Sequence, residues 1–360
     1  MTERASSSPS PAEVASRFQA LREGIATRVI GLDDVVENLL VCLLSGGHCL
    51  LTGVPGLAKT LLISTLSDLI SLDFRRIQFT PDLMPADITG TEVIAEDKET
   101  GEREFRYLPG PIFANIILAD EINRTPPKTQ AALLEAMEEG AVTSVGERHP
   151  LDEPFFVLAT QNPIEQEGTY PLPAAQLDRF MMNLSLDYPS EANEYEIVRR
   201  TISTDPPVLE PVLEADEVRG LLDTVRRTAA PDAVVAEAVR LVRATRPSLD
   251  TAPDPARRWL AWGAGPRAIH ALVLGAKARA LVQGRVDPTT EDVWALAWPV
   301  LRHRLIPNHR AVASQVSMDQ VLGSIRDELL GVPVVESVGW LPRLIELARG
   351  VVSPREKAPA

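Results

Sequence analysis

The sequence predicts an α/β domain built on a parallel sheet, followed by a smaller domain that is nearly all helical. Up to about residue 190, short apolar runs alternate with helical stretches, the pattern of parallel strands joined by crossover helices. From Asp216 onward the pattern is almost entirely helical. A length of 360 residues is too great for one simple core, which agrees with two domains.

Three segments are the clearest strand candidates, because each is almost continuously apolar, as expected of strands buried on both faces. They are residues 48–52, 116–119 and 155–160. In the helical half, two sets of apolar residues fall at helical spacing: Val218, Leu221, Leu222 and Val225, and then Val235, Ala238, Val239 and Val242. A later helix is introduced by Thr289 and Asp292, which have the spacing of a capping box.

The domain boundaries follow from these patterns and from proline content. We expect a disordered tail at 1–14, the α/β domain at 15–200, and a linker at 201–215 that contains Pro206, Pro207 and Pro211. The helical domain then covers 216–330, and an extension with a tail covers 331–360. The chain shows no internal repeat.

Composition limits the class of protein. The 36 basic and 50 acidic side chains give a net charge of −14, which disfavours general nucleic-acid binding, although a local basic patch stays open. Cys42 and Cys49 have no second pair or histidine ladder beside them, so we interpret both as small core residues in a reducing compartment. The N-terminus has no secretory signal and no run approaches a membrane span, so we expect a cytoplasmic protein.

A phosphate-binding loop is predicted directly after the first strand. It reads Gly53, Val54, Pro55, Gly56, Leu57, Ala58, Lys59 and Thr60, and a helical run begins at Leu61. Backbone N–H groups and the positive helix N-terminus then face phosphate, Lys59 neutralises the β- and γ-phosphates, and the Thr60 hydroxyl can ligate Mg²⁺. The strict pattern has glycine where Ala58 stands, and we expect alanine to enter the first helical turn there without strain.

A second strand ends in two carboxylates, Asp120 and Glu121. Carboxylates at the C-terminal end of a strand in an open α/β sheet lie in the ligand crevice. We therefore expect Asp120 to hold Mg²⁺ through its water shell and Glu121 to polarise an attacking water. The alternative is a pair of solvated acids that begin a loop.

Three further polar residues follow in order. Asn162 comes after the strand at 155–160 and can reach a water or the γ-phosphate, or it simply forms a turn before Pro163.

Arg179 is a candidate arginine finger for a neighbouring subunit's nucleotide, or an ordinary partner of Asp178. Arg267 follows Pro266 at the start of a helix and could contact phosphate from the side of the helical domain.

Taken together, these motifs resemble the MoxR family of AAA+ ATPases over roughly residues 15–325. The motifs that carry the resemblance are residues 53–60, 120–124, 159–163, 177–180 and 265–267, with 126–137 and 301–305 in support. The resemblance implies a P-loop AAA+ domain with a helix-2 insert and a helical lid, assembled as a ring, often a hexamer. It assigns Lys59 and Thr60 to Walker A, Asp120 and Glu121 to Walker B and Asn162 to sensor 1, with Arg179 as the trans arginine finger and Arg267 as sensor 2.

Two short hairpins match the insertions of this family, at 91–107 and 141–151. Hairpins of this kind project and touch a substrate, or they only cap a sheet edge. The chain departs from the family pattern at Ala174, often Glu, and at Gly265, often Ser. Neither change removes a phosphate ligand. The segment 332–353 has no match, and a packing extension or a helix for a partner both fit it.

The sequence thus predicts hydrolysis of Mg-ATP. By resemblance, the first interpretation is chaperone-like remodelling or maturation of a client protein with a von Willebrand factor A-domain partner. The second is a nucleic-acid motor or transcription regulator, which the net charge of −14 disfavours. The third is a regulatory switch that mainly binds nucleotide.

Overall fold

A five-stranded parallel sheet organises the first domain. This computed structural model describes residues 9–96, 103–144, 146–163, 168–203 and 208–331. The sheet has the order β10-β1-β9-β6-β3. Its strands are β1 (Cys49–Gly53), β3 (Phe74–Gln78), β6 (Ile116–Asp120), β9 (Phe156–Gln161) and β10 (Met182–Leu186). The three strands expected from the sequence are confirmed to within one residue at each end.

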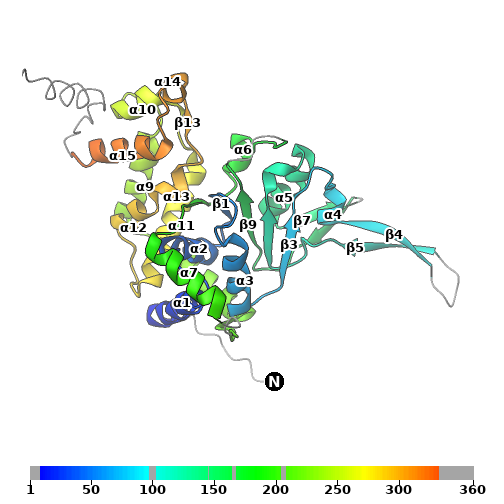
Figure 1. Cartoon of the computed structure of the whole chain (residues 1–360). Helices are drawn as coiled ribbons and strands as arrows, with labels where there is room; N and C mark the ends of the chain where they lie inside the picture. The colour runs from blue at the N-terminus through cyan, green and yellow to red at the C-terminus, as the bar shows by residue number, and fades with distance from the viewer. Residues whose placement is uncertain (1–8, 97–102, 145, 164–167, 204–207, 332–360) are drawn as a thin grey trace, which may run out of the picture.

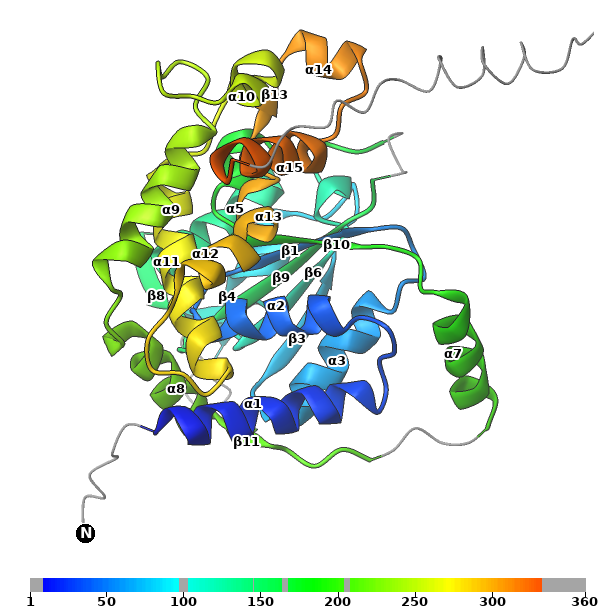
Figure 2. The same ribbon diagram turned by 90° about the vertical axis from the view of Figure 1, so that its left-hand side faces the viewer.

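The sheet is buried on both faces, which explains why its strands lack polar alternation. Successive side chains point to opposite faces, so Leu51 packs with helices on one side and Leu50 with helices on the other. The helices of this domain are α1 (Pro11–Ala26), α2 (Asp33–Leu44), α3 (Lys59–Leu69), α4 (Pro85–Thr89), η1 (Ile122–Arg124), α5 (Pro127–Glu139), α6 (Ala174–Leu177) and α7 (Glu191–Ser203). Helices α1, α2 and α3 share the core of the first face and α4 and α5 that of the second, with the sheet between them (Figures 1 and 2).

The first helix begins inside the segment that the sequence analysis assigns to a tail. Helix α1 starts at Pro11, and Ser10 and Glu13 form a reciprocal capping box at its N-terminus. Val14 is already buried in the core. The expectation that the tail extends to residue 14 is therefore wrong by about one helical turn, because the capping box at Ser10 and the burial of Val14 order the chain from Pro11.

Both predicted hairpins form, each as a separate antiparallel pair. The first joins β4 (Gly90–Glu96) to β5 (Arg103–Pro109), and the second joins β7 (Ala141–Ser144) to β8 (Glu147–Pro150). The β4–β5 hairpin reaches away from the rest of the domain (Figure 1). Ile94 and Phe105 are paired across it and are 61% and 70% exposed.

The second domain is helical, as predicted. Strand β11 (Leu213–Glu214) pairs with β2 (Ile70–Ser71) and leads into it. Its helices are α8 (Ala215–Arg227), α9 (Asp232–Ala244), α10 (Asp254–Trp259), α11 (Pro266–Val282), α12 (Thr290–Ala295), α13 (Ala297–Leu301), α14 (His309–Ala313) and α15 (Met318–Leu329), and β12 (Leu260–Trp262) pairs with β13 (Ile306–Pro307). Helix α11 packs on α1 and α2, so both domains share one hydrophobic core.

Among the helices of the second domain, α9 is rotated from the predicted orientation. Val235 is 37% exposed, whereas Val234 and Leu241 are buried with Ala238 and Val242. Helix α9 has apolar residues on two adjoining faces, and helical spacing is satisfied by either face. The predicted face is therefore not the one that is buried. The face predicted for α8 and the capping box predicted at Thr289 are both confirmed.

Two predictions from composition meet direct observations. Cys42 and Cys49 are buried, unbridged core residues, as expected. Within the described ranges, no helix is long and apolar enough to cross a membrane. The predicted extension at 332–353 lies outside the described residues.

Candidate active site

The phosphate loop lies between β1 and α3, at the C-terminal edge of the sheet. Gly56 has φ +86° and Ala58 has φ 54°, and such left-handed residues in a turn direct backbone N–H groups into one concavity. Helix α3 begins at Lys59 with no side-chain cap, which leaves its first-turn donors to an anion. The loop is therefore shaped as a phosphate cradle.

The backbone conformation of Ala58 differs from the prediction. Alanine was expected to enter the helix without strain, yet it holds the left-handed conformation that glycine adopts at no steric cost. The strain of a single left-handed alanine is about 1–2 kcal/mol. The position that departs from the strict motif is thus the one where the backbone favours glycine.

One cavity of about 370 Å³ brings together the predicted phosphate loop, the two carboxylates and Asn162. Residues from three segments line it: Pro55, Gly56, Ala58, Lys59, Thr60 and Leu61 from the loop and α3, Asp120 and Glu121 from the end of β6, and Asn162 after β9. Gly53, Val54 and Leu57 belong to the same loop and do not line the cavity. The strand order places β9 between β1 and β6, so the C-terminal ends of all three meet at this cavity.

Lys59 lies folded over the loop. Its Nζ donates a hydrogen bond to the Gly53 carbonyl at 2.6 Å. Partial burial lowers the pKa of Lys59, and the nearby Asp120 and Glu121 carboxylates act in the opposite direction by favouring its charged form. The ammonium group thus stands between the loop and the two acids.

Asp120 and Glu121 are held by residues that the sequence analysis missed. Thr160 donates from Oγ1 to Asp120 Oδ1 at 2.7 Å and accepts from the Glu121 N–H at 2.8 Å. Arg76 donates from Nη2 to Asp120 Oδ2 at 2.6 Å. Gln78 donates to Glu121 Oε2 at 3.1 Å. These partners come from the neighbouring strands β9 and β3, so only the order of the sheet could reveal them.

Glu121 is additionally fixed by its own loop. Its backbone is left-handed, with φ 57°, and Arg124 donates to its Oε2 at 2.9 Å. A non-glycine residue in this region costs energy and is maintained by its surroundings, which is common at functional sites. Glu121 and Asn162 line the same cavity.

The donors at the cavity fit Mg²⁺. This cation takes oxygen ligands and keeps several waters, using one or two protein groups together with substrate phosphates. The Thr60 hydroxyl and the Asp120 carboxylate are oxygen donors on the same cavity. No cluster of three or more His, Cys, Asp or Glu side chains suited to a metal occurs in the described part of the chain, so a closed protein cage is not formed there.

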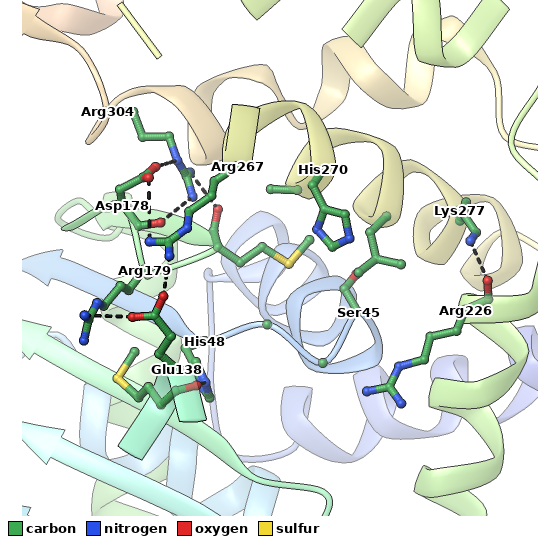
Figure 3. A pocket seen from close by; sticks show the side chains of 16 residues that line it. Ser45, His48, Glu138, Asp178, Arg179, Arg226, Arg267, His270, Lys277 and Arg304 are labelled. Carbon is green, nitrogen blue, oxygen red and sulfur yellow. Dashed lines mark hydrogen bonds and ion pairs between the residues drawn. The ribbon is translucent and has the colours of Figure 1, made fainter. Parts of the chain in front are cut away.

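The structure does not bring Arg179 and Arg267 to this cavity. Both line a second cavity of about 610 Å³, together with Gly47, His48 and Glu138 (Figure 3). Gly47 and His48 precede β1, whereas the phosphate loop follows it. The five residues of β1 span roughly 16 Å, so one chain cannot apply both arginines and the loop to the same phosphate.

Acidic side chains hold these two arginines. Glu138 Oε2 lies 2.7 Å from Arg179 Nη2, and Glu138 Oε1 also pairs with Arg267 Nη2. Arg179 donates from Nη1 to the Leu134 carbonyl at 2.6 Å. Asp178 Oδ2 lies 3.9 Å from Arg267 Nη1, and Asp178 Oδ1 accepts a hydrogen bond from Arg304.

Arg304 joins the two domains beside this cavity. It donates from Nε to Asp178 Oδ1 at 2.7 Å and from Nη2 to the Phe180 carbonyl at 2.7 Å. Burial lowers the pKa of this guanidinium, while its bond to Asp178 acts in the opposite direction. The segment that carries Arg179 is thereby tied to the residues after α13.

Comparisons with known proteins agree with this geometry. Residues 48–182 match the ATPase family associated with various cellular activities (AAA), and residues 256–324 match the AAA lid domain. The chain is 41% identical to Chaperone MoxR1 of Mycobacterium tuberculosis over 91% of its length and 85% of that protein. It is 29% identical to Protein MoxR of Methylorubrum extorquens, covering 81% of this chain and 88% of that one.

A solved structure shows the same fold. The crystal structure of a candidate ATPase from Cytophaga hutchinsonii aligns with a TM-score of 0.81 and 38% identity, covering 88% of this chain and 95% of that one. The resemblance expected from the motifs is confirmed by these relatives, and the chain belongs to the MoxR family of AAA+ ATPases.

Proposed function

We propose that this chain hydrolyses Mg-ATP at a site completed between neighbouring subunits of a ring, and uses the cycle for chaperone-like remodelling or maturation of a client protein. The observation that carries the proposal is the separation of the two cavities. The phosphate loop and both carboxylates lie at one end of β1, and Arg179 and Arg267 lie at the other. Contacts between unlike faces of successive copies close into rings when the rotation permits.

At the loop cavity, each residue has a positioning or electrostatic role. Backbone N–H groups and Lys59 hold the phosphates, while Thr60 and Asp120 are the residues that hold Mg²⁺. When bound, Mg²⁺ offsets the negative charge of the phosphate oxygens. Glu121 orients and polarises the attacking water, and Asn162 contacts that water or the γ-phosphate.

The arginines act on the neighbouring subunit's nucleotide. Arg179 approaches as the arginine finger, and Arg267 contacts the same phosphates from the lid. An arginine finger supplied in trans stabilises the charge of the transition state and is worth about 10³–10⁵ in rate. Hydrolysis then depends on assembly.

The client role rests on the relatives and on one surface. Chaperone MoxR1 carries that role in its name. The β4–β5 hairpin presents Ile94 and Phe105 to solvent, and exposed apolar side chains on a projecting element suit contact with a protein client. We further propose a hexameric ring and a von Willebrand factor A-domain partner, both by analogy with the family.

The Glu121→Gln variant tests the catalytic assignment. It keeps the size of the side chain and removes its charge, so we expect normal ATP binding with kcat lowered by about 10²-fold or more. ATP binding by calorimetry and phosphate release at steady state measure the two quantities. Lys59→Ala is the control, because it loses binding itself. Turnover of Glu121→Gln at the parent rate would remove Glu121 from the mechanism.

A further inference from the structure

We propose that Glu138 is a positioning residue for ATP hydrolysis, which joins Arg179 and Arg267 into one pair presented to the next subunit. This inference rests on the proposed function, because it assigns work to arginines that act in trans. The two carboxylate oxygens of Glu138 are divided between the two guanidiniums: Oε2 lies 2.7 Å from Arg179 Nη2, and Oε1 pairs with Arg267 (Figure 3).

The pair is built from two domains. Arg179 precedes β10 in the first domain, and Arg267 lies in the first turn of α11 in the lid. Glu138 reaches both from the last turn of α5. Through Glu138, a movement of the lid changes the position of both arginines at once.

Helix stability does not explain this glutamate. A negative charge in the last turn of a helix opposes the helix dipole and costs about 0.3–1 kcal/mol. Helix α5 has no basic residue in its last turn to offset that cost. The α5 sequence is therefore unfavourable locally at this position.

The ion pairs also contribute little to folding. Glu138 is 41% exposed and Arg267 is 51% exposed, and exposed pairs are worth about 0–1 kcal/mol. Two guanidiniums share one carboxylate, so the trio keeps a net positive charge and still attracts phosphate. What the contacts do provide is a fixed position for each guanidinium. A free arginine side chain has about 2 kcal/mol of rotamer entropy, and the contacts with Glu138 restrict that freedom before the nucleotide is met.

Order matters at a site of phosphoryl transfer. Misplacement of a charged group by about 1 Å can cost about 10²-fold in rate. Arg179 is located by Glu138 and by the Leu134 carbonyl, both on α5. Arg267 is located by Glu138 and more loosely by Asp178 at 3.9 Å. Loss of the Glu138 charge releases one contact on each arginine at once.

The experiment compares Glu138→Gln with Glu139→Gln in the assembled ring. Glu139 is the next residue in the same helical turn and does not line the 610 Å³ cavity, so it is a matched control. We expect Glu138→Gln to lower kcat by about tenfold or more while KM and ATP affinity stay within about twofold, because the phosphate loop is untouched. Glu139→Gln should match the parent chain.

A double-mutant cycle separates positioning from a structural role. If Glu138 acts through the arginines, the loss caused by Glu138→Gln is smaller in an Arg179→Ala or Arg267→Ala background than in the parent. An unchanged kcat, a raised kcat, an equal loss in every background, or a loss explained by failed assembly would each overturn the inference.

The outcome for Arg179→Ala distinguishes the two levels of the account. If that variant hydrolyses ATP at the parent rate, the proposed function fails and this inference fails with it. If Arg179→Ala is slow and Glu138→Gln is normal, only the role of Glu138 is lost.

Discussion

At the residue scale, the loop cavity holds two strained backbones, Ala58 and Glu121, with φ 54° and 57°. Each is maintained by its neighbours. The O=C of Ala58 accepts the first bond of α3 from Leu62, and the N–H of Glu121 is bonded to Thr160. The strain is therefore held by the strand ends and the helix start that form the site, and it fixes where the loop N–H groups and the Glu121 carboxylate point.

A partly buried histidine, His48, lines the second cavity. The Val157 N–H donates to His48 Nδ1 at 3.1 Å, which makes Nε2 the protonated nitrogen, and Nε2 donates to the Met137 carbonyl at 3.1 Å. Burial lowers the pKa of His48 to about 4, although the bond to Met137 acts in the opposite direction. The imidazole of His48 is therefore neutral. Its two hydrogen bonds connect β9 to Met137 near the end of α5, one residue before Glu138.

This burial predicts a pH dependence of stability. The pKa of His48 is lower in the folded chain than its ordinary value of 6.5, so the unfolded chain binds more protons between about pH 6.5 and 4. Stability is then lost as the pH falls through that window. For His48 alone the loss from about pH 7.5 to about pH 5 is about 2 kcal/mol.

The measurement is the free energy of unfolding from urea titrations at both pH values, in the parent and in His48→Gln. Glutamine keeps a donor for Met137 and cannot titrate, so the variant should show a smaller difference between the two pH values. The remaining slope includes His303, whose pKa burial also lowers. Equal slopes in both chains would contradict the assignment.

The sequence predicted residues that line the loop cavity but not those that hold them in position. Lys59 belongs to the loop motif after β1, Asp120 ends β6 and Asn162 follows β9, so a motif and two strand ends were enough to place them at one edge. Thr160 and Arg76 act across the sheet, and the order of strands that brings them to Asp120 depends on long-range packing. Glu138 gave no signal, because its partners are distant in the chain.

At the scale of elements, the contact of α13 with β10 ties the lid to the first domain. Arg304 is the main polar connection there, with only 3% of its side chain exposed. Its partners are Asp178 and the carbonyls of Phe180, Met181 and Val300. A buried cation with many acceptors is costly to remove, because its partners are left without donors.

Arg304→Met is therefore expected to destabilise the chain by about 3–5 kcal/mol. Arg257→Met is the control, because Arg257 forms an exposed pair with Asp254 and should cost about 1 kcal/mol or less. Chemical denaturation of both variants beside the parent gives the comparison. A loss for Arg304→Met as small as that of the control would show that this connection does not hold the lid.

Element types were easier to predict than their orientations. The helical spacing in α8 has one apolar face and was oriented correctly, whereas α9 has apolar residues on adjoining faces and was not. The arrangement of α11 against α1 and α2 is set by tertiary packing, which local periodicity does not encode. For this reason the sequence predicts Arg267 at a helix start and leaves the direction of its side chain open.

At the scale of the whole molecule, the two cavities make the chain asymmetric. One end of the sheet carries the phosphate loop, and the other carries the cavity that Arg179 and Arg267 line. In the ring proposed above, a head-to-tail arrangement of identical copies would set each arginine pair against the next loop, and closure of the ring would leave no site incomplete. The β4–β5 hairpin projects away from the rest of the first domain (Figure 1).

The most direct test of this account mixes two inactive variants. Arg179→Ala keeps the loop and Glu121, and Glu121→Gln keeps the arginines, so each alone should bind ATP and hydrolyse it very slowly. Combined in equal amounts before ATP is added, they should recover about a quarter of the parent rate, because a random head-to-tail ring places an intact loop beside an intact arginine at about one site in four. A mixture as slow as its components, or full activity of Arg179→Ala alone, would contradict a site shared between subunits.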